Sequence, residues 1–216
     1  NNPINGIINY AQMILDKERG LGEIREISDR IVKEGERVAR IVASLLSYAR
    51  RGVQEETATS VEELINESLT LIGAQMKKEA ITLDVSFSDS LPRVFCVPQE
   101  IQQVFLNVIS NARDALNRKF PENEGDKRLE IFADVDETKG DRWVRVVFRD
   151  NGTGIDDNIK DKITKPFFST KPKGKGTGLG LSISHDIIRN NGGELVIDSE
   201  TGYSTTVQVR LPEVTM

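Results

Sequence analysis

Hydrophobic positions in the first fifty residues recur at helical spacing. The apolar residues of 4–17 fall on one helical stripe, and the two glycines within 18–22 predict a turn after it. Residues 23–50 then carry a heptad repeat, made of Ile24, Ile31, Val38 and Leu45 with companions at Ile27, Glu34, Ile41 and Tyr48. Only Glu34 interrupts this seam. The pattern predicts an antiparallel helical hairpin that buries its seam in a bundle.

Two helices alone provide a poor hydrophobic core, so the seam needs a further partner. One solution is a homodimer that forms a four-helix bundle, and the other is a monomeric hairpin packed against the rest of the chain. The length of the heptad repeat favours the dimer. The polar stretch from Arg50 to Ser60 predicts a linker. We therefore place one domain in residues 1–52 and a second in residues 60–216.

The pattern of the second part alternates between helical and strand spacing. Ser60 followed by Glu63 is typical of a capping box at a helix start, and Pro98 suits the first turn of another helix. Period-two alternation predicts strands, two of them joined as a hairpin around 136–141. We expect helices near 61–76, 98–117 and 179–191, and strands near 81–87, 94–97, 129–135, 143–148, 195–198 and 205–211. The fold class is α+β, with a mixed, mostly antiparallel sheet covered by helices on one face.

Composition narrows the function classes. A hydrophobic content of 38% and a charged content of 29% over 216 residues fit a soluble globular protein. The net charge of −5 argues against a nucleic-acid-binding surface. The single cysteine excludes an intrachain disulfide and fits a reducing compartment. We find no apolar run of the ~20 residues that a membrane span needs, so we expect a cytoplasmic fragment, although its parent protein could be attached to a membrane.

Candidate chemistry concentrates between Asp150 and Leu181. This stretch contains DNGTGI from Asp150, PFFSTK from Pro166 and GKGTGLGLSIS from Gly174. Glycine loses much backbone freedom on folding, so such clusters persist where the backbone approaches a ligand or takes a positive φ. The last glycines lead directly into an apolar helical pattern, and a helix N-terminus favours phosphate. The stretch predicts a nucleotide site with a mobile lid.

Other motifs are ambiguous when each is considered alone. Asn107 and Asn111 share one face of the helix after Pro98. Their amide oxygens could ligate Mg²⁺ without adding negative charge near a triphosphate, or they could form local hydrogen bonds. Asp150 could accept a hydrogen bond from an exocyclic amine such as that of adenine, or it could belong to an ordinary Asp-Asn-Gly turn. Lys171 and the lysines after it could neutralise phosphate or be solvated in a surface loop.

The asparagine pair of the helix after Pro98, DNGTGI, PFFSTK and the last glycine cluster are four motifs. In this order they resemble the histidine-kinase catalytic domain of two-component signalling. The matching blocks are QQVFLNVISNARDAL, DNGTGI, PFFSTK and GTGLGLSIS, extended by GGELVIDSE and GYSTTVQVRLP. The resemblance implies a Bergerat-type α/β sandwich that binds ATP. It assigns Mg²⁺ to Asn111 with help from Asn107, adenine to Asp150, Gly152 and Gly154, and support of Asp150 to Thr205. It assigns the phosphates and lid to Lys171, Gly176, Thr177, Gly178, Leu179 and Gly180.

Two positions depart from the family pattern. Ser204 stands where the last glycine motif usually has Gly, which raises a question about the backbone before Thr205. Asp114 stands where many members carry Lys. Because an acid near the phosphates would be unfavourable, we expect Asp114 to point away from them.

Residues 1–50 resemble the end of the family's dimerisation and histidine-phosphotransfer hairpin. Asn2-Pro3 matches the Asn-Pro of His-Glu-x-x-Asn-Pro, which would place the phosphoacceptor histidine upstream of Asn1. The chain has no initiator Met, and we interpret it as a fragment whose upstream part is missing. Asn2 matches the residue that, in related kinases, can orient water for dephosphorylating the partner regulator. His185 is the only histidine, and we interpret it as an ordinary surface residue of a helix.

Related ATPases of this fold use a Glu on the asparagine-bearing helix as the general base for water. This chain has Asn107 one turn before Asn111 and no acid there, which predicts slow hydrolysis. The function implied is a histidine kinase, which transfers the ATP γ-phosphoryl to a histidine upstream of Asn1 and then to an aspartate of a response-regulator receiver domain. The alternative is an ATP-responsive dimeric scaffold or phosphatase that docks a response regulator.

Overall fold

The computed structural model of the chain describes residues 55–121, 125–138, 141–171 and 176–214, together with residues 7, 10–11, 14, 22–24, 26–28, 30–31, 35 and 38. The chain divides into two compact units. The first comprises Asn1–Gln54 and Phe167–Leu179, and the second comprises Glu55–Pro166 and Gly180–Met216.

The described residues between Ile7 and Val38 are helical, as their spacing predicts. Ile27 is buried, and Arg30 forms an ion pair with Glu26 one turn away, at 2.6 Å. Gly22 lies in a helix, although it was expected in a turn. Asn2 and the heptad positions Glu34, Ile41, Leu45 and Tyr48 lie outside the described residues, so the four-helix bundle stays a prediction.

A five-stranded sheet forms the centre of the second unit, in the order β2-β4-β5-β7-β6. β2 pairs with β4 in parallel, and every other neighbouring pair in this sheet is antiparallel. The mixed, mostly antiparallel sheet that the pattern predicts is thereby confirmed. The strands are β2 (Thr82–Phe87), β4 (Arg128–Thr138), β5 (Asp141–Asp150), β6 (Glu194–Glu200) and β7 (Ser204–Pro212).

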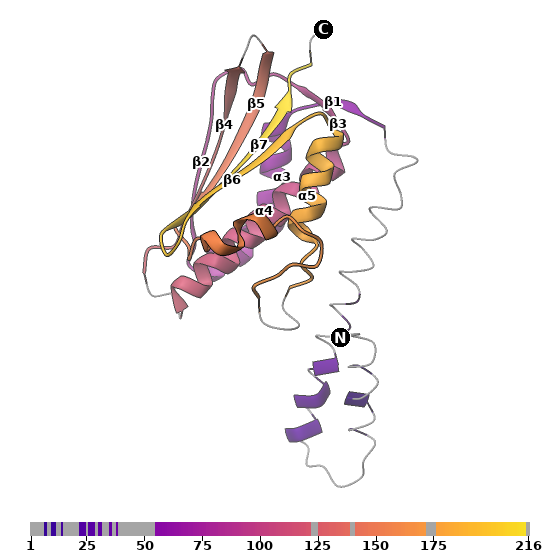
Figure 1. Ribbon diagram of the computed structural model, residues 1–216, viewed down its shortest axis with the longest axis vertical. Coiled ribbons are helices and arrows are strands. Elements are labelled where there is room, and N and C mark those ends of the chain that lie inside the picture. The colour runs from indigo at the N-terminus through magenta and orange to yellow at the C-terminus, as the bar shows by residue number, and fades with distance from the viewer. Residues whose placement is uncertain are drawn as a thin grey trace. The chain divides into compact units, whose positions relative to one another are not determined.

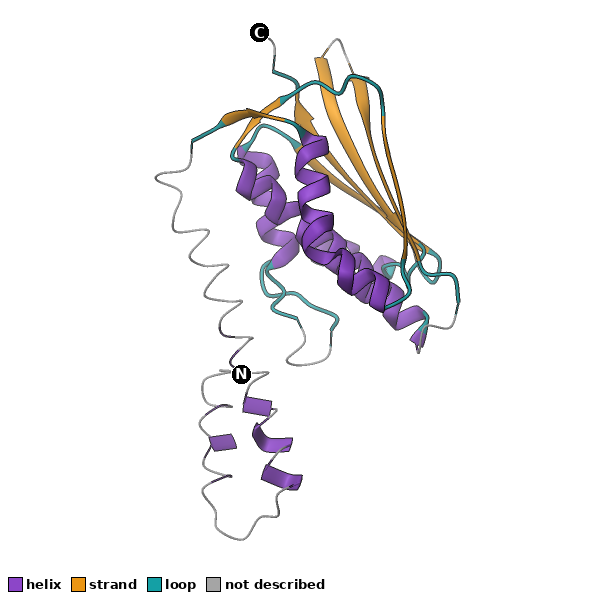
Figure 2. Ribbon diagram, turned by 180° about the vertical axis from the view of Figure 1, so that it is seen from behind, coloured by secondary structure: helices purple, strands orange, loops and turns teal. Residues whose placement is uncertain are grey.

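Three helices, α3 (Val61–Lys78), α4 (Pro98–Lys119) and α5 (Gly180–Asn190), cover one face of this sheet (Figure 1, Figure 2). The Ser60 side chain accepts a hydrogen bond from the Glu63 nitrogen at 3.3 Å, which caps α3 as expected. α4 begins at Pro98, where the missing N–H costs nothing. The core lies between the helices and the sheet, and the Phe105 ring of α4 packs against Phe148 of β5 with their centroids 5.5 Å apart.

Two short elements differ from expectation. β1 (Thr57–Thr59) lies in the stretch interpreted as a linker and pairs with β3 (Val94–Cys96) as a separate two-stranded sheet. Three residues are too few to show a period, so only the pairing reveals this strand. A 3₁₀ helix, η2 (Asp157–Lys162), follows the DNGTGI loop, and Asp156 caps it by accepting from the Asn158 nitrogen at 2.8 Å.

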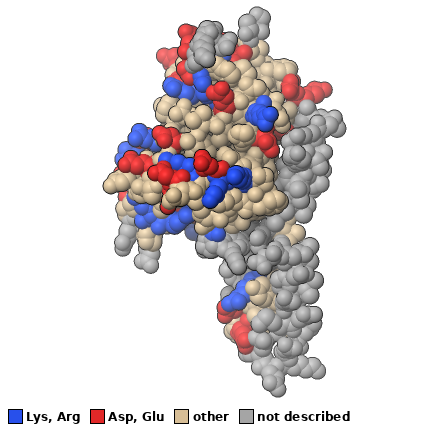
Figure 3. All heavy atoms as spheres, viewed as in Figure 1, with Lys and Arg blue, Asp and Glu red and all other residues tan. Residues whose placement is uncertain are grey.

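Basic and acidic side chains are intermixed on the face shown in Figure 3. Ion pairs also connect strands of the sheet, because Arg145 lies 2.6 Å from Asp134 and Arg210 lies 2.8 Å from Asp136. Among the described residues, no helix combines the length and hydropathy required to span a bilayer.

Candidate nucleotide site

Asp150 ends β5 and is buried, with 5% of its surface exposed. The Gly152 nitrogen donates to Asp150 Oδ1 at 2.9 Å. Burial raises the pKa of the carboxyl to about 6, against the lowering effects of the Gly152 hydrogen bond and the Lys119 charge. A buried carboxyl whose pKa is displaced this far is a candidate functional group, and here it offers an acceptor to a ligand amine.

The two glycines of the following loop are required by their surroundings. A Cβ on Gly152 would lie 2.6 Å from Asp150 Oδ1 and 2.7 Å from the Cβ of Ala115. Gly154 has φ +63°, and a Cβ there would collide with the Glu200 carbonyl oxygen. The glycines therefore let the loop lie closely between α4 and the turn that joins β6 to β7.

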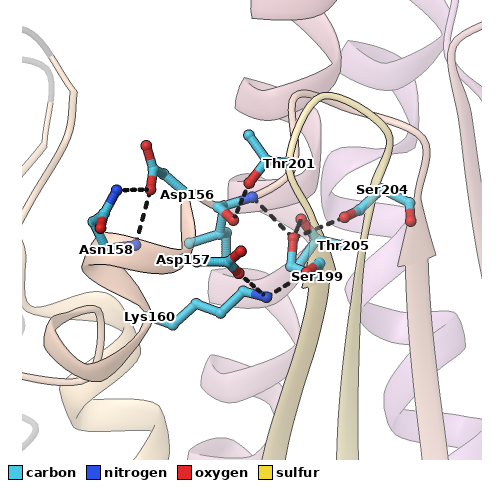
Figure 4. A network of polar contacts seen from close by, with 9 residues as sticks. Asp156, Asp157, Asn158, Lys160, Ser199, Thr201, Ser204 and Thr205 are labelled. Carbon is cyan, nitrogen blue, oxygen red and sulfur yellow. Dashed lines mark hydrogen bonds and ion pairs between the residues drawn. The ribbon is translucent and has the colours of Figure 1, made fainter.

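This β6–β7 turn holds the loop by its backbone. The Gly202 nitrogen donates to the Thr153 carbonyl at 2.8 Å. Thr201 Oγ1 donates to the Ile155 carbonyl at 3.0 Å, and the Ile155 nitrogen donates to Ser199 Oγ at 2.9 Å (Figure 4). Both main-chain polar groups of Ile155 thus bond to the hairpin.

Lys119, in the last turn of α4, joins the same two segments from another side. Its Nζ donates to the Asn151 carbonyl at 2.8 Å and to the Tyr203 carbonyl at 3.1 Å. Sequence reasoning did not identify this residue, and no local pattern separates it from other lysines near a helix C-terminus.

The sheet register aligns three buried polar side chains in one row. Asp150 lies directly opposite Thr205, and Thr205 lies directly opposite Ser199. Directly opposite side chains project from the same face of a sheet. The Thr205 hydroxyl lies 3.2 Å from Ser199 Oγ. Ser199 is not among the residues predicted from the sequence, although the alternation of β6 places it on the face of Leu195 and Ile197, where a polar residue is unusual.

Ser204 does not need the conformation of a glycine. It begins β7 and is absent from the described residues with positive φ, whereas Gly202 supplies the left-handed position of the turn at φ +83°. The question that its departure from the family pattern raised is thereby answered.

The paired asparagines lie on α4 near the start of α5. Asn107 Nδ2 donates to the Gly180 carbonyl at 3.2 Å and to Ser184 Oγ at 3.3 Å. Since the amide nitrogen is used in this way, the amide oxygen is the atom that could ligate a metal. Asn111 is half-buried one turn further along the same face. Asp114 forms an ion pair with Arg113 at 3.0 Å.

α5 begins at Gly180 and has no acidic residue in its first turn. The N–H groups that point out of this end of the helix, together with the helix dipole, favour an anion. The segment before it, Phe167–Leu179, belongs to the first unit.

Within that segment the backbone closes on itself. A Cβ on Gly178, which has φ +67°, would collide with the Phe167 carbonyl carbon. A Cβ on Gly176 would lie 2.5 Å from Ser169 Oγ and 3.1 Å from Lys171 Cδ. The Leu179 nitrogen donates to Thr177 Oγ1 at 3.3 Å. The described ends of this segment, residues 167–171 and 176–179, therefore lie close together, and their contacts leave no room for side chains at Gly176 and Gly178.

A shallow pocket of 180 Å³ lies between η2 and β6. It shares only Ser199 with the row that contains Asp150, so we do not assign the nucleotide to it. Its lining residues are Lys160, Ile163, Thr164, Leu195, Ile197 and Ser199.

Comparison with known families agrees with this geometry. Residues 96–215 match the family of histidine kinase-, DNA gyrase B- and HSP90-like ATPases, and residues 1–54 match the His Kinase A (phospho-acceptor) domain. The chain belongs to the two-component sensor histidine kinases. Both the family resemblance and the α+β fold class are thereby confirmed.

Curated relatives of this kinase are much longer than the chain. It is 35% identical to the two-component sensor PprA of Pseudomonas aeruginosa over 192 residues, which cover 89% of the chain and 20% of PprA. It is 28% identical to the sensor histidine kinase ZraS of Escherichia coli over 211 residues, which cover 98% of the chain and 43% of ZraS. The chain therefore spans less than half the length of these relatives.

Solved kinase structures share the fold. The catalytic domain of histidine kinase ThkA matches with a TM-score of 0.62 and 30% identity, covering 74% of this kinase and 96% of that domain. A structure of ThkA in complex with the response regulator protein TrrA matches with a TM-score of 0.76 and 25% identity, covering 99% of this kinase and 58% of that chain.

Proposed function

We propose that this kinase binds ATP with Mg²⁺ and delivers the γ-phosphoryl group to a histidine side chain. The observation that carries the proposal is the buried Asp150 carboxyl beside a loop whose glycines cannot be replaced. An acceptor at the end of a strand, with backbone close on both sides, suits the amine edge of adenine.

The phosphates would lie toward the N-terminus of α5, where Gly180 begins the helix. The amide oxygens of Asn107 and Asn111 would hold Mg²⁺, which offsets the charge that develops during phosphoryl transfer. Lys171 and the residues Gly176, Thr177, Gly178 and Leu179 would form the lid over the phosphates.

Water is a poor acceptor in this arrangement. α4 presents amides at Asn107 and Asn111, and the nearby carboxylate of Asp114 is paired with Arg113. A neutral amide cannot remove a proton from water, so hydrolysis without a phosphoacceptor should be slow. Catalysis rests instead on positioning and on charge stabilisation.

His185 is the sole histidine of the sequence, and it is a half-exposed residue of α5 beside Asp186. We assign it no role in transfer. The match of Asn2-Pro3 to the phosphotransfer motif supports an acceptor histidine that precedes Asn1 in the parent protein. Asn2 itself is a candidate for orienting water when a regulator is dephosphorylated.

Two partners follow from the same assignment. A hairpin in residues 1–52 would form the homodimer, while residues 60–216 would bind the nucleotide. The phosphoryl group would then pass to an aspartate in the receiver domain of a response regulator. The ThkA–TrrA complex supports such docking, because it is a kinase of similar fold bound to a response regulator.

Titration with Mg-ATP in a calorimeter tests the nucleotide site. Asp150→Asn keeps the shape but replaces the acceptor carboxylate, so we expect at least about tenfold weaker binding. Asp89→Asn, at an exposed turn, is the matched control and should bind normally. Equal affinity in Asp150→Asn would refute the site.

Incubation with γ-labelled ATP tests the assignment of the acceptor. The 216-residue chain should bind ATP and remain unlabelled, and a longer chain that includes the upstream histidine should become labelled. Strong labelling of the 216-residue chain would contradict the assignment.

A further inference from the structure

Ser199 is buried and lies at the centre of a hydrogen-bond network that joins the DNGTGI loop to the start of β7 (Figure 4). Its Oγ accepts from the Ile155 nitrogen at 2.9 Å, donates to the Ser204 carbonyl at 2.7 Å and lies 3.2 Å from Thr205 Oγ1. Its own carbonyl accepts from Lys160 Nζ at 2.6 Å. Both the hydroxyl and the carbonyl oxygen of Ser199 therefore have hydrogen-bond partners.

The number of protons decides the direction of the Thr205 contact. A serine hydroxyl has one proton, and that of Ser199 is used by the short hydrogen bond to the Ser204 carbonyl. The Ile155 N–H can only donate. The proton between Ser199 and Thr205 must therefore come from Thr205, which leaves the Thr205 oxygen able only to accept.

The register then places two acceptors side by side. Thr205 lies directly opposite Asp150, and both side chains project from the same face of the sheet. Asp150 presents a carboxylate, and Thr205 presents a hydroxyl oxygen whose proton points to Ser199. Such a pair favours a ligand edge that carries two N–H groups, or one amine and a bridging water.

We propose that Ser199 is a positioning residue for base selection. It holds the Thr205 hydroxyl as an acceptor, so that a purine with an amino group at C6 is bound and a purine with a carbonyl oxygen at C6 is rejected. The inference rests on the proposed nucleotide site and adds to it the residue that sets its preference among bases. Ser199 itself touches no ligand.

Loss of Ser199 would release this constraint. The Thr205 hydroxyl could then rotate and donate to a C6 carbonyl oxygen, which would reduce the penalty on that base. If the role of Ser199 were purely structural, its loss should weaken the binding of both bases by the same factor. The loop that contains Asp150 and Ile155 would then loosen whichever base is bound.

Thr201 offers a matched control for that difference. Its hydroxyl holds the other main-chain group of Ile155, the carbonyl, at 3.0 Å. It is an exposed residue of the β6–β7 turn. Thr201→Ala therefore removes a loop anchor of the same kind while leaving the Thr205 proton bonded to Ser199.

The experiment compares binding of ADP and inosine diphosphate to the 216-residue chain by calorimetry. In Ser199→Ala, we expect the affinity ratio in favour of ADP to fall by about tenfold. In Thr201→Ala, both affinities should fall together and the ratio should stay at its unsubstituted value. In Ser199→Thr, which keeps the hydroxyl, the ratio should be retained.

Each outcome decides the matter. An unchanged affinity ratio in Ser199→Ala, or a ratio in Thr201→Ala that falls as far as it does in Ser199→Ala, would overturn the inference and leave the nucleotide site intact. If the unsubstituted chain bound neither diphosphate, the proposed function would fail as well. Should Ser199→Ala not fold, Ser199→Cys replaces it with a weakly hydrogen-bonding group, and an unchanged ratio there would equally refute the proposal.

Discussion

The amide nitrogen of Asn107 donates to the carbonyl oxygen of Gly180 over 3.2 Å, so α4 holds the first residue of α5. Ser184 Oγ donates to the same carbonyl at 2.9 Å. One asparagine thereby fixes the end of the helix that would receive phosphate, while its amide oxygen remains suited to a metal. The structural and the ligand-binding roles of Asn107 use different atoms.

Asn107→Asp tests the contact between Asn107 and the Gly180 carbonyl without changing the size of the side chain. The variant replaces the donor with a carboxylate oxygen, which repels the Gly180 carbonyl and adds a negative charge near the phosphates. We expect a loss of about 1–3 kcal/mol in the free energy of unfolding, and weaker Mg-ATP binding by calorimetry. Asn66→Asp, on the exposed face of α3, is the control. Identical behaviour of the two variants would argue against the contact.

Asp150→Asn should stabilise the protein above neutral pH. Because the folded-state pKa of Asp150 is raised to about 6, its favourable contribution is present below the unfolded pKa and is lost as pH rises through the folded one. Between pH 4 and pH 7.5 the unsubstituted chain should therefore lose about 2 kcal/mol more unfolding free energy than the variant. Urea unfolding measured at both pH values checks this, with Asp89→Asn as the control. Equal losses in Asp150→Asn and the unsubstituted chain would show that the carboxyl titrates normally.

Gly154→Ala should damage the loop directly. The residue has φ +63°, and the new methyl group would meet the Glu200 carbonyl. We expect a loss of more than about 2 kcal/mol in the free energy of unfolding, together with loss of ADP binding. Gly73→Ala is the contrasting variant, because nothing lies within 4 Å of a Cβ there and the site is helical. It should gain about 0.5–1 kcal/mol, and chemical denaturation distinguishes the two.

Lys119→Met should change both the stability of the protein and the charge at Asp150. The variant loses the hydrogen bonds to the Asn151 and Tyr203 carbonyls, so we expect about 1–2 kcal/mol of destabilisation. It also removes a positive charge that lowers the pKa of Asp150, so that pKa should rise further. Carbon NMR of the Asp150 carboxyl follows the titration. Lys78→Met, at the exposed end of α3, should leave the titration as it is, and an unmoved curve in Lys119→Met would contradict the role.

Periodic elements could be predicted because burial imposes their spacing. α4 shows this well, since its apolar positions and Pro98 predict both its inner face and its start. The importance of the loop glycines could also be anticipated. Glycine loses much backbone freedom on folding, so a cluster of glycines indicates that the backbone there is constrained by its surroundings. The reason itself, such as the Glu200 carbonyl against Gly154, is visible only in the structure.

Residues that act through register could not be found from the sequence. Ser199 matters because β7 brings Thr205 between it and Asp150, and that neighbourhood depends on the order of three strands. Lys119 is similar, since its partners lie on two different loops. β1 escaped notice for another reason, because its three residues pair with β3 and show no period of their own.

The two hydrogen bonds that Ser199 and Thr201 form with the main chain of Ile155 have a consequence for synthesis of the chain on the ribosome. The loop that carries Asp150 is made before its anchors, because Ser199 follows Ile155 by 44 residues and Thr201 follows it by 46. Until the β6–β7 hairpin emerges, the loop has neither bond. A nascent chain would therefore gain both bonds to the Asp150 loop only after β6 and the turn that follows it have been made, later than the synthesis of α4 and its two asparagines.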